Sequence, residues 1–364
     1  MKNTFGNNIS ITLFGESHGT AIGAVVDGLP AGIEVNEDFI AYQLDLRRPF
    51  GKISTPRQEK DKFEIISGVF NGKTTGTPIC IVIPNENTKS KDYSETYGKA
   101  RPGHADYTAF CKYKGFEDYR GGGHFSGRVT AGLVAAGAIA IDLLSKKGIK
   151  IGTHISKCAG VEDNYFTDFE NDIKQLSNKK FPVLSEEKGE AIVKNIEKIA
   201  QDGDSIGGVL ETAVIGLPVG IGEPWFDSVE SLLSHALFSI PAIKGVEFGA
   251  GFSSADMLGS QMNDSFYFNG DKITTKTNNN GGINGGITNG MPVIFKCAVK
   301  PTPSISKEQE TVDFKNNENT VTSVKGRHDP CIVHRARVVV DSVTALVLCD
   351  LLSQKFGTDW LGGK

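Results

Sequence analysis

The distribution of apolar and polar positions predicts a chain of short strands and a few long helices. Six strands are predicted, over residues 8–14, 21–27, 63–70, 78–84, 208–217 and 291–299. The first two flank a loop at residues 15–19, and the turn-forming pair Asn71-Gly72 separates the next two. A helix is predicted over residues 35–46, where it ends before Pro49.

Two later segments, residues 128–146 and 338–352, are apolar almost all round. A helix of this kind is buried on most of its sides. Gly132 and Gly137 in the first segment would let neighbouring elements approach closely. Two buried helices with strands before and after them predict layers of sheet packed over central helices.

Other segments carry weaker signals. Residues 227–239 read as a helix with a capping box at Asp227 and Glu230, stopped by Pro241. Residues 306–320 are polar and are expected to form an exposed loop. The length alone suggests two or three domains, but no Pro/Ser-rich linker divides the chain, and a single large unit over residues 1–364 is the alternative.

Composition narrows the class of protein. The net charge is −4 and the pI is about 6.0, which argues against broad nucleic-acid binding. The six cysteines are scattered without a CxxC pair, so we expect reduced core thiols and no zinc site. No signal peptide is visible at the N-terminus, and the apolar stretches are too short for a membrane span. We therefore expect a cytoplasmic protein that binds neither nucleic acid nor membranes.

The arginines are unevenly placed. The chain has none between Val129 and Gly326, although lysines are frequent there. Five of the seven histidines lie in the same two end regions as the arginines. Since arginine offers a rigid, permanently charged fork to carboxylates and phosphates, this clustering favours a site for a small polyanion. Ordinary surface salt bridges are the alternative.

The segment with the strongest chemical signal is Arg120-Gly121-Gly122-Gly123, immediately before the first buried helix. Consecutive glycines and a helix start can present backbone N–H groups to an anion. The segment lacks the Gly-Lys-Ser/Thr ending of a P-loop, and a flexible turn is the alternative.

Several other residues could act as acids, bases or anion ligands. His18 and His104 lie in loops and could be general acids, or could simply be solvated or capping residues. Lys300 follows a strand and could contact a phosphate, or mark an ordinary strand end. Asp329 could be a base or could cap the second buried helix.

Taken together, these segments resemble the chorismate synthase family along nearly the whole chain. The resemblance is carried by residues 14–19 (Phe-Gly-Glu-Ser-His-Gly), 47–49 (Arg-Arg-Pro), 101–107, 118–123, 204–208, 222–224, 244–249, 279–283, 300–302 and 326–331 (Gly-Arg-His-Asp-Pro-Cys). It implies an α+β fold, a single large domain with helices sandwiched between antiparallel sheets, and a homotetramer.

The resemblance also implies a reaction. Family members remove phosphate and a hydrogen from 5-enolpyruvylshikimate 3-phosphate in an anti-1,4-elimination that gives chorismate. They require reduced FMN without net redox change, and NADPH is a possible reductant of that flavin. Two carboxylates and a phosphate on the substrate agree with the clustered arginines.

By the family's motifs, three groups of residues are implied. The catalytic residues are His18, which would protonate the departing phosphate, His104, which would protonate the reduced flavin, and Asp329, which would take part in proton removal. Substrate binding is implied for Arg47, Arg48, Arg101, Arg120 and Arg128. Cofactor binding is implied for Arg47, Lys52, His124, Phe125, Ser126, Pro241, Ala242, Gly285, Lys300, Pro301, Thr302, Pro303, Ser304 and Arg327.

This sequence departs from the family at two places. Many members have Arg-Ser-Ser-Ala-Arg after the glycines, whereas residues 124–128 are His-Phe-Ser-Gly-Arg here. The region after Pro49 is one residue shorter, which affects the match of Lys52. The competing functions are a flavin-binding or anion-binding regulatory protein that kept the fold and lost the activity, and a flavin oxidoreductase. The presence of His18, His104 and Asp329 disfavours the first, and the absence of a G-x-G-x-x-G fingerprint disfavours the second.

Overall fold

A computed structural model describes residues 2–55, 60–86, 97–324 and 329–362. Residues 4–84 contribute the strands of one antiparallel sheet, in the order β1 (Thr4–Phe5), β2 (Ser10–Gly15), β3 (Ala21–Asp27), β7 (Ile79–Pro84) and β4 (Glu64–Ser67). A second antiparallel sheet has the order β11 (Ile243–Phe248), β16 (Val293–Val299), β10 (Gly208–Ile215), β8 (Lys150–Cys158) and β9 (Val161–Glu162).

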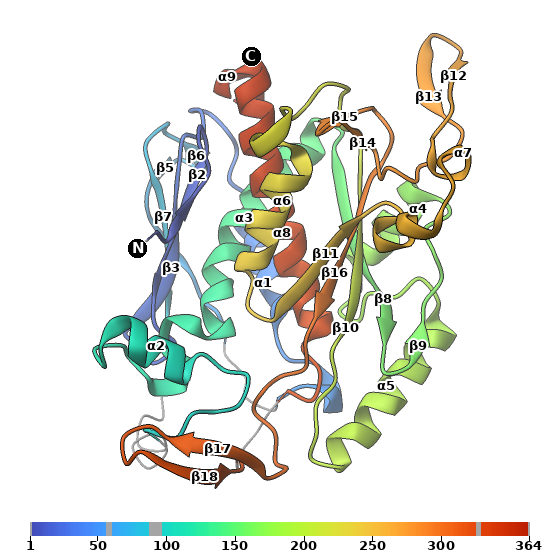
Figure 1. The fold of residues 1–364 in the computed structure, drawn as a ribbon. Coiled ribbons are helices and arrows are strands. Elements are labelled where there is room, and N and C mark those ends of the chain that lie inside the picture. The colour runs from blue at the N-terminus through green and yellow to red at the C-terminus, as the bar shows by residue number, and fades with distance from the viewer. Residues whose placement is uncertain (1, 56–59, 87–96, 325–328, 363–364) are drawn as a thin grey trace.

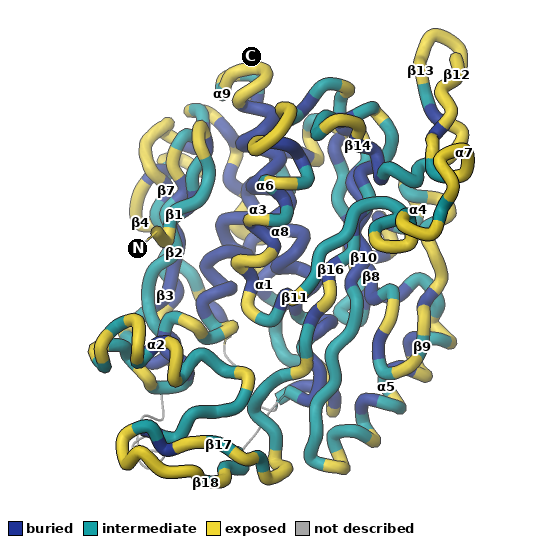
Figure 2. Tube along the Cα trace, in the orientation of Figure 1, coloured by how far each residue is buried: buried dark blue, intermediate teal, exposed yellow. Residues whose placement is uncertain are grey.

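Four helices lie between the two sheets (Figure 1): α1 (Glu37–Arg47), α3 (Thr130–Lys146), α6 (Val229–Ser239) and α8 (Val333–Phe356). Figure 2 shows that α3 and α8 are buried along most of their length. The expectation that every apolar stretch is too short for a membrane span is wrong for residues 127–146, which are long and apolar enough, but 78% of the most apolar window is buried inside the fold. This stretch is therefore a core helix. The predicted α+β sandwich is confirmed.

Glycines set the close packing of the central layer, as predicted. A Cβ at Gly132 would lie 2.7 Å from the backbone of Gly23 in β3, and a Cβ at Gly137 would lie 2.2 Å from the side chain of Ser342 in α8. Real Cβ atoms do not approach this closely, so α3 depends on these two glycines to contact both a sheet and a helix. Buried hydrophobic residues from Ile9 to Leu361 form one core cluster.

The remaining elements cover the outside. The helices are α2 (Asp106–Tyr113), α4 (Phe169–Ser177), α5 (Glu186–Gln201), α7 (Gly259–Met262) and α9 (Thr358–Gly362). Short hairpins are β5–β6 (Val69–Phe70, Lys73–Thr74), β12–β13 (Phe266–Asn269, Lys272–Thr275), β14–β15 (Ile283–Asn284, Ile287–Thr288) and β17–β18 (Gln309–Asp313, Glu318–Thr322). 3₁₀ turns lie at η1 (Gly51–Ile53), η3 (Arg120–Phe125), η4 (Gly127–Val129), η5 (Trp225–Asp227) and η6 (Gly251–Asp256).

Two local predictions are corrected and a third is confirmed. The stretch at 306–320 is not a simple loop, because β17 and β18 pair within it. The helix predicted over 227–239 begins at Val229, where the Ser228 hydroxyl caps the N–H of Ser231, so the Asp227 capping box is wrong. The predicted hairpin turn at Asn71-Gly72 is confirmed, because Phe70 pairs with Lys73 across it, although β5 and β6 form a separate two-stranded sheet.

Candidate active site

The loop between β2 and β3 carries His18 and lies against the triple-glycine segment. The Ser17 N–H donates to the carbonyl of Gly123 (3.1 Å), and the Ser17 hydroxyl donates to the carbonyl of Gly121 (3.0 Å). Nδ1 of His18 lies 3.0 Å from Oγ of Ser17. Because the hydroxyl proton of Ser17 points to a carbonyl, Nδ1–H of His18 is the donor in this second bond. His18 is only 6% exposed, so its ring orientation is fixed by the fold.

The glycine segment brings His18 and His104 together. Gly121, Gly122 and Gly123 all have positive φ, at 58°, 84° and 53°. A Cβ at Gly121 would lie 2.2 Å from Cε1 of His18, and a Cβ at Gly122 would lie 3.0 Å from Nε2 of His104. The two imidazoles thus contact neighbouring residues whose Cα atoms are about 3.8 Å apart. The segment is a packed turn rather than the flexible one considered from sequence.

His104 is oriented by a carboxylate at the start of α2. Its Nδ1 lies 2.7 Å from Oδ1 of Asp106. The same carboxylate accepts from Nε (2.8 Å) and Nη2 (2.7 Å) of Arg101. Burial alone would raise the pKa of Asp106, but the hydrogen bonds from Arg101 and His104 outweigh it and hold that pKa far below its usual value. Asp106 therefore remains an anion, which directs Nδ1–H of His104 toward itself and leaves Nε2 facing Gly122.

Arg120 also has a carboxylate partner. Its Nε and Nη2 donate to the two oxygens of Asp118, at 2.8 and 2.7 Å. The hydrogen bond from Arg120, opposed by partial burial, lowers the pKa of Asp118. The Arg120 side chain is 38% exposed, so a fixed guanidinium still faces solvent beside the glycines.

Three segments distant in sequence meet beside the His104 loop. The Lys300 ammonium donates to the carbonyl of Gly103, and the Lys300 N–H donates to the carbonyl of Ala242 (2.9 Å). The hydroxyl of Thr302 donates to the carbonyl of Asp329 (2.6 Å). The predicted positions 241–242, 300–304 and 329 are therefore neighbours at one end of the second sheet.

Asp329 is held by an ion pair and is not a helix cap. Its Oδ1 accepts from the N–H of Thr55 (2.9 Å), and its Oδ2 accepts from Nη1 of Arg335 (2.6 Å). Nε of Arg335 donates in turn to the carbonyl of Arg47 (2.9 Å). The capping alternative is wrong, because the N-cap of α8 is Ile332, whose aliphatic side chain cannot accept a hydrogen bond.

Arg47 and Arg128 have internal partners. Nε of Arg47 donates to the Thr130 hydroxyl (2.9 Å), and Nε of Arg128 donates to the amide oxygen of Asn85 (3.1 Å). The buried carboxylate of Asp61 pairs with both guanidinium groups. This cluster fastens the end of α1 to the start of α3, and both arginine side chains are less than 10% exposed.

The other predicted positions differ in their surroundings. Arg48 pairs with Asp45 at 3.2 Å, and its buried Nε has no hydrogen-bond partner among the described residues. His124 directs Nδ1 to the carbonyl of Gly15 (2.8 Å), which adds a further contact between this stretch and the start of the His18 loop. Phe125 is 38% exposed.

Of two further predicted cofactor positions, one accepts a backbone hydrogen bond and the other is exposed to solvent. The Ser126 hydroxyl accepts from the N–H of Arg128 (3.2 Å) and so caps the short turn before α3. Lys52 is exposed in η1. Arg327 lies outside the described residues.

Gly285 and Ala242, two of the predicted cofactor residues, lie at opposite ends of α6. Gly285 lies in the β14–β15 turn, where the carbonyl of Gly286 accepts from the N–H of Val229 at the start of α6. Ala242 follows the other end of this 11-residue helix. At 1.5 Å per residue the two positions are separated by roughly 16 Å.

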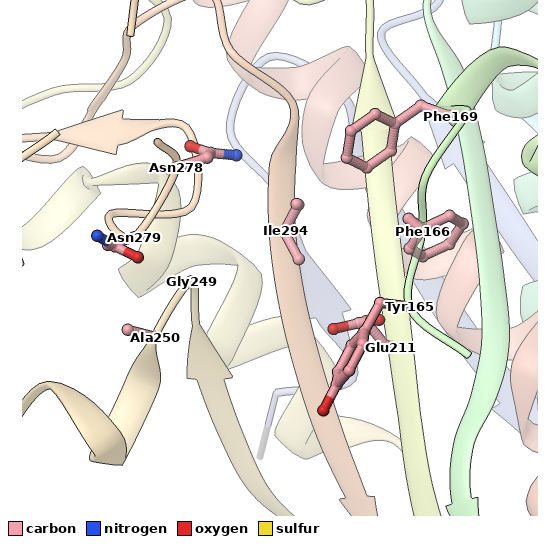
Figure 3. A pocket seen from close by; sticks show the side chains of 9 residues that line it. All are labelled: Tyr165, Phe166, Phe169, Glu211, Gly249, Ala250, Asn278, Asn279 and Ile294. Atoms are coloured by element: carbon pink, nitrogen blue, oxygen red, sulfur yellow. The ribbon is translucent and has the colours of Figure 1, made fainter. Parts of the chain in front are cut away.

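A pocket on the second sheet is distinct from this cluster (Figure 3). It is lined by Tyr165, Phe166, Phe169, Glu211, Gly249, Ala250, Asn278, Asn279 and Ile294, none of which is a predicted site residue. Beneath it, His154 lies between Asp163 and Glu211, at 3.0 Å from each. Burial alone would lower the pKa of His154, but the two carboxylates raise it by more, so this pKa lies above its usual value.

Comparison with known proteins identifies the family of this chain. A family model for chorismate synthase matches residues 9–353. The chain belongs to the chorismate synthase family. Its relatives include the chorismate synthases of Dehalococcoides mccartyi, 50% identical over 96% of both chains, and of Methanocaldococcus jannaschii, 48% identical over 97% of this chain and 96% of the other. A crystal structure of chorismate synthase has a TM-score of 0.76 at 31% identity, covering 97% of this chain and 94% of that one.

The family assignment confirms the activity predicted from the sequence. The enzyme is a phosphate-eliminating lyase of aromatic amino acid biosynthesis, and the family uses reduced FMN. Sequence reasoning did not single out Asp106, Arg335, Asp61 or Asn85, which hold the named residues. Asp106 could have been found, since it lies two residues after His104 in the same motif.

Proposed function

We propose that phosphate elimination from 5-enolpyruvylshikimate 3-phosphate takes place where the triple glycine meets His18 and His104. In this proposal His18 protonates the departing phosphate, His104 protonates the flavin, and Asp329 accepts a proton. The observation that carries the proposal is the contact of both imidazoles with adjacent glycines. A cofactor and a substrate sharing this space would each have an acid of fixed orientation beside them.

The substrate's two carboxylates and phosphate are assigned to the arginines that keep solvent exposure. These are Arg48, Arg101 and Arg120, with side chains 33%, 22% and 38% exposed. Each is already paired with an aspartate, which fixes its position while further N–H groups remain available to an anion. The resemblance also implied substrate binding for Arg47 and Arg128. In this proposal they act by holding the end of α1 and the start of α3 together beside the site.

The residues around the cluster fit an FMN site. The Lys300 ammonium and the Nε of Arg48, which has no hydrogen-bond partner within the described part of the chain, are cationic donors suited to a phosphate or a ring carbonyl. The exposed ring of Phe125 offers a flat apolar face. We assign cofactor contacts to Lys52, His124, Phe125, Ser126, Pro241, Ala242, Lys300, Pro301, Thr302, Pro303, Ser304 and Arg327. Reduced FMN, when bound, supplies electron density that helps phosphate to leave.

The acid–base roles predict a specific kinetic effect. His18→Ala and His104→Ala should each lower kcat by roughly 10²–10⁴-fold, because a positioned acid typically contributes that much. The KM for substrate should change far less, since anion binding is assigned to arginines. Anaerobic steady-state kinetics with reduced FMN measures both constants. Full turnover in both variants would make the two histidines structural.

The cofactor requirement gives a second prediction. Chorismate should form with chemically reduced FMN and should not form with oxidised FMN in the absence of a reductant. An added arm with oxidised FMN and NADPH tests whether the chain reduces its own flavin, for which NADPH is the proposed donor. Chorismate formation with oxidised FMN alone would contradict the requirement. FMN binding without turnover under every condition would favour the regulatory alternative, and NADPH oxidation without chorismate would favour an oxidoreductase.

The assembly is proposed to be a cytoplasmic homotetramer. Phe266, Phe268 and Ile273 are more than half exposed on the β12–β13 hairpin, which projects from the body (Figure 1). Large exposed apolar side chains of this kind are typical of protein interfaces. The cofactor contact that the family's motifs imply for Gly285 is assigned in this assembly to a second copy of the chain. Light scattering should give four times the 39.1 kDa chain mass, and a monomer mass would contradict the tetramer.

A further inference from the structure

We infer that Asn85 is a positioning residue that holds the His18 loop in its place beside the proposed substrate site. Asn85 follows the last residue of β7. Its Nδ2 donates to the carbonyls of Glu16 and Gly19, both at 2.9 Å, so one amide spans the two ends of the turn that carries His18. Its backbone N–H also donates to the carbonyl of Thr20 (3.1 Å).

The orientation of this amide is determined by its third partner. The amide oxygen of Asn85 accepts from Nε of Arg128 at 3.1 Å. A guanidinium can only donate and a carbonyl can only accept, so the oxygen must face Arg128 and the NH₂ must face the loop. Arg128 is fixed in turn by its ion pair with the buried Asp61. The start of α3 is thereby connected to the His18 loop through one side chain.

The loop is held from two sides. On one side Ser17 and His124 connect it to the glycine segment. On the other side the Asn85 amide holds its carbonyl groups. Removing this amide would leave the glycine contacts in place but release the turn to shift. A displacement of about 1 Å at a catalytic group can cost about 100-fold in rate. This inference rests on the proposed catalytic role of His18.

Asn85→Ala is the test variant, with Asn195→Ala as its matched control. Asn195 also donates from a partly buried amide to a carbonyl, that of Ala159 at 3.0 Å, but it lies on α5. Asn85→Ala should lower kcat by roughly 10–100-fold. KM for substrate and Kd for reduced FMN should stay within about threefold of wild type, and Asn195→Ala should have wild-type kinetics. In protein with ¹³Cε1-labelled histidine, the His18 signal should shift in Asn85→Ala only, its assignment coming from its loss in His18→Ala.

The outcomes separate positioning from a merely structural role. A kcat for Asn85→Ala within threefold of the control would overturn the inference, and so would a slow variant whose His18 signal has not moved. If Asn85→Ala does not fold, Asn85→Asp decides by the same criteria, because it keeps the acceptor for Arg128 and loses both donors to the loop. Full activity of His18→Ala would refute the role of His18 itself, whereas the histidine signal would still report whether Asn85 positions the ring.

Discussion

Gly121→Ala is expected to lower turnover by roughly 100-fold or more while the chain still folds. A Cβ at this position would lie 2.2 Å from both Cε1 and Nδ1 of His18 and 2.7 Å from Oγ of Ser17. The residue has φ +58°, a conformation that alanine adopts only with strain. Either the imidazole or the glycine turn must move, and both belong to the proposed site. The measurement is anaerobic chorismate formation with reduced FMN, together with a thermal melt to confirm folding.

Gly127→Ala is the matched control in the same stretch. No described atom lies within 4 Å of a Cβ built at Gly127, and its φ is not positive. Many family members carry alanine at the matching position, between the serine and the arginine. Gly127→Ala should therefore retain turnover within about twofold of wild type. A folded Gly121→Ala with wild-type kcat would show that the glycine contact with His18 has no part in catalysis.

The parts of the fold set by local pattern were predicted well. The strands β2, β3, β10 and β16 and the buried helices α3 and α8 have strong apolar patterns, and each lies within a few residues of its predicted position. The β17–β18 hairpin was missed because its strands are polar, although alternate positions are half-buried and Asp313 is buried. Its backbone is ordered by contacts elsewhere, such as the pairing of Lys99 with Asp313, which no local signal reveals.

The site was predicted less completely than the fold. The glycine segment, His18 and His104 have recognisable local sequences, and the structure brings them together. The residues that support them have no recognisable local sequence, because their contacts are long-range. Asn85 contacts residues more than 40 positions away, and Arg335 contacts the carbonyl of Arg47 across 288 positions. Direct ligand contacts for Arg47 and Arg128 remain a prediction from sequence, and what the sequence did not reveal is that both guanidinium groups also bind internal acceptors such as the carbonyl of Gly127 and the carboxylate of Asp61. A charged residue's type is visible in a sequence, but its partner is not.

Asp329→Asn is expected to lower kcat by roughly 10²–10⁴-fold, because an amide cannot accept the proton that the proposal assigns to this carboxylate. The structure also predicts that the folded state of this variant is less stable than that of the wild type. Asn offers one acceptor for the Thr55 N–H or the Arg335 guanidinium, and its NH₂ group would face the other donor. Losing a hydrogen bond to a charged group costs about 1.5–3 kcal/mol. Thermal or denaturant unfolding would measure the stability, and anaerobic turnover would measure kcat.

Asp264→Asn is the control that separates the loss of turnover from the loss of stability. It removes a mostly buried carboxylate that is far from the site but likewise accepts backbone N–H groups. Asp264 accepts from the N–H groups of Asn279 and Asn280, at 2.7 and 2.8 Å, beside the β12–β13 hairpin. Its pKa is lowered because these hydrogen bonds and that of Thr277 outweigh its burial, so it is also an anion whose loss weakens a loop. Asp264→Asn should lose stability with nearly normal turnover, and Asp329→Asn should lose both. If Asp329→Asn binds reduced FMN and substrate and turns over at the rate of Asp264→Asn, then Asp329 serves only as the anchor for Arg335.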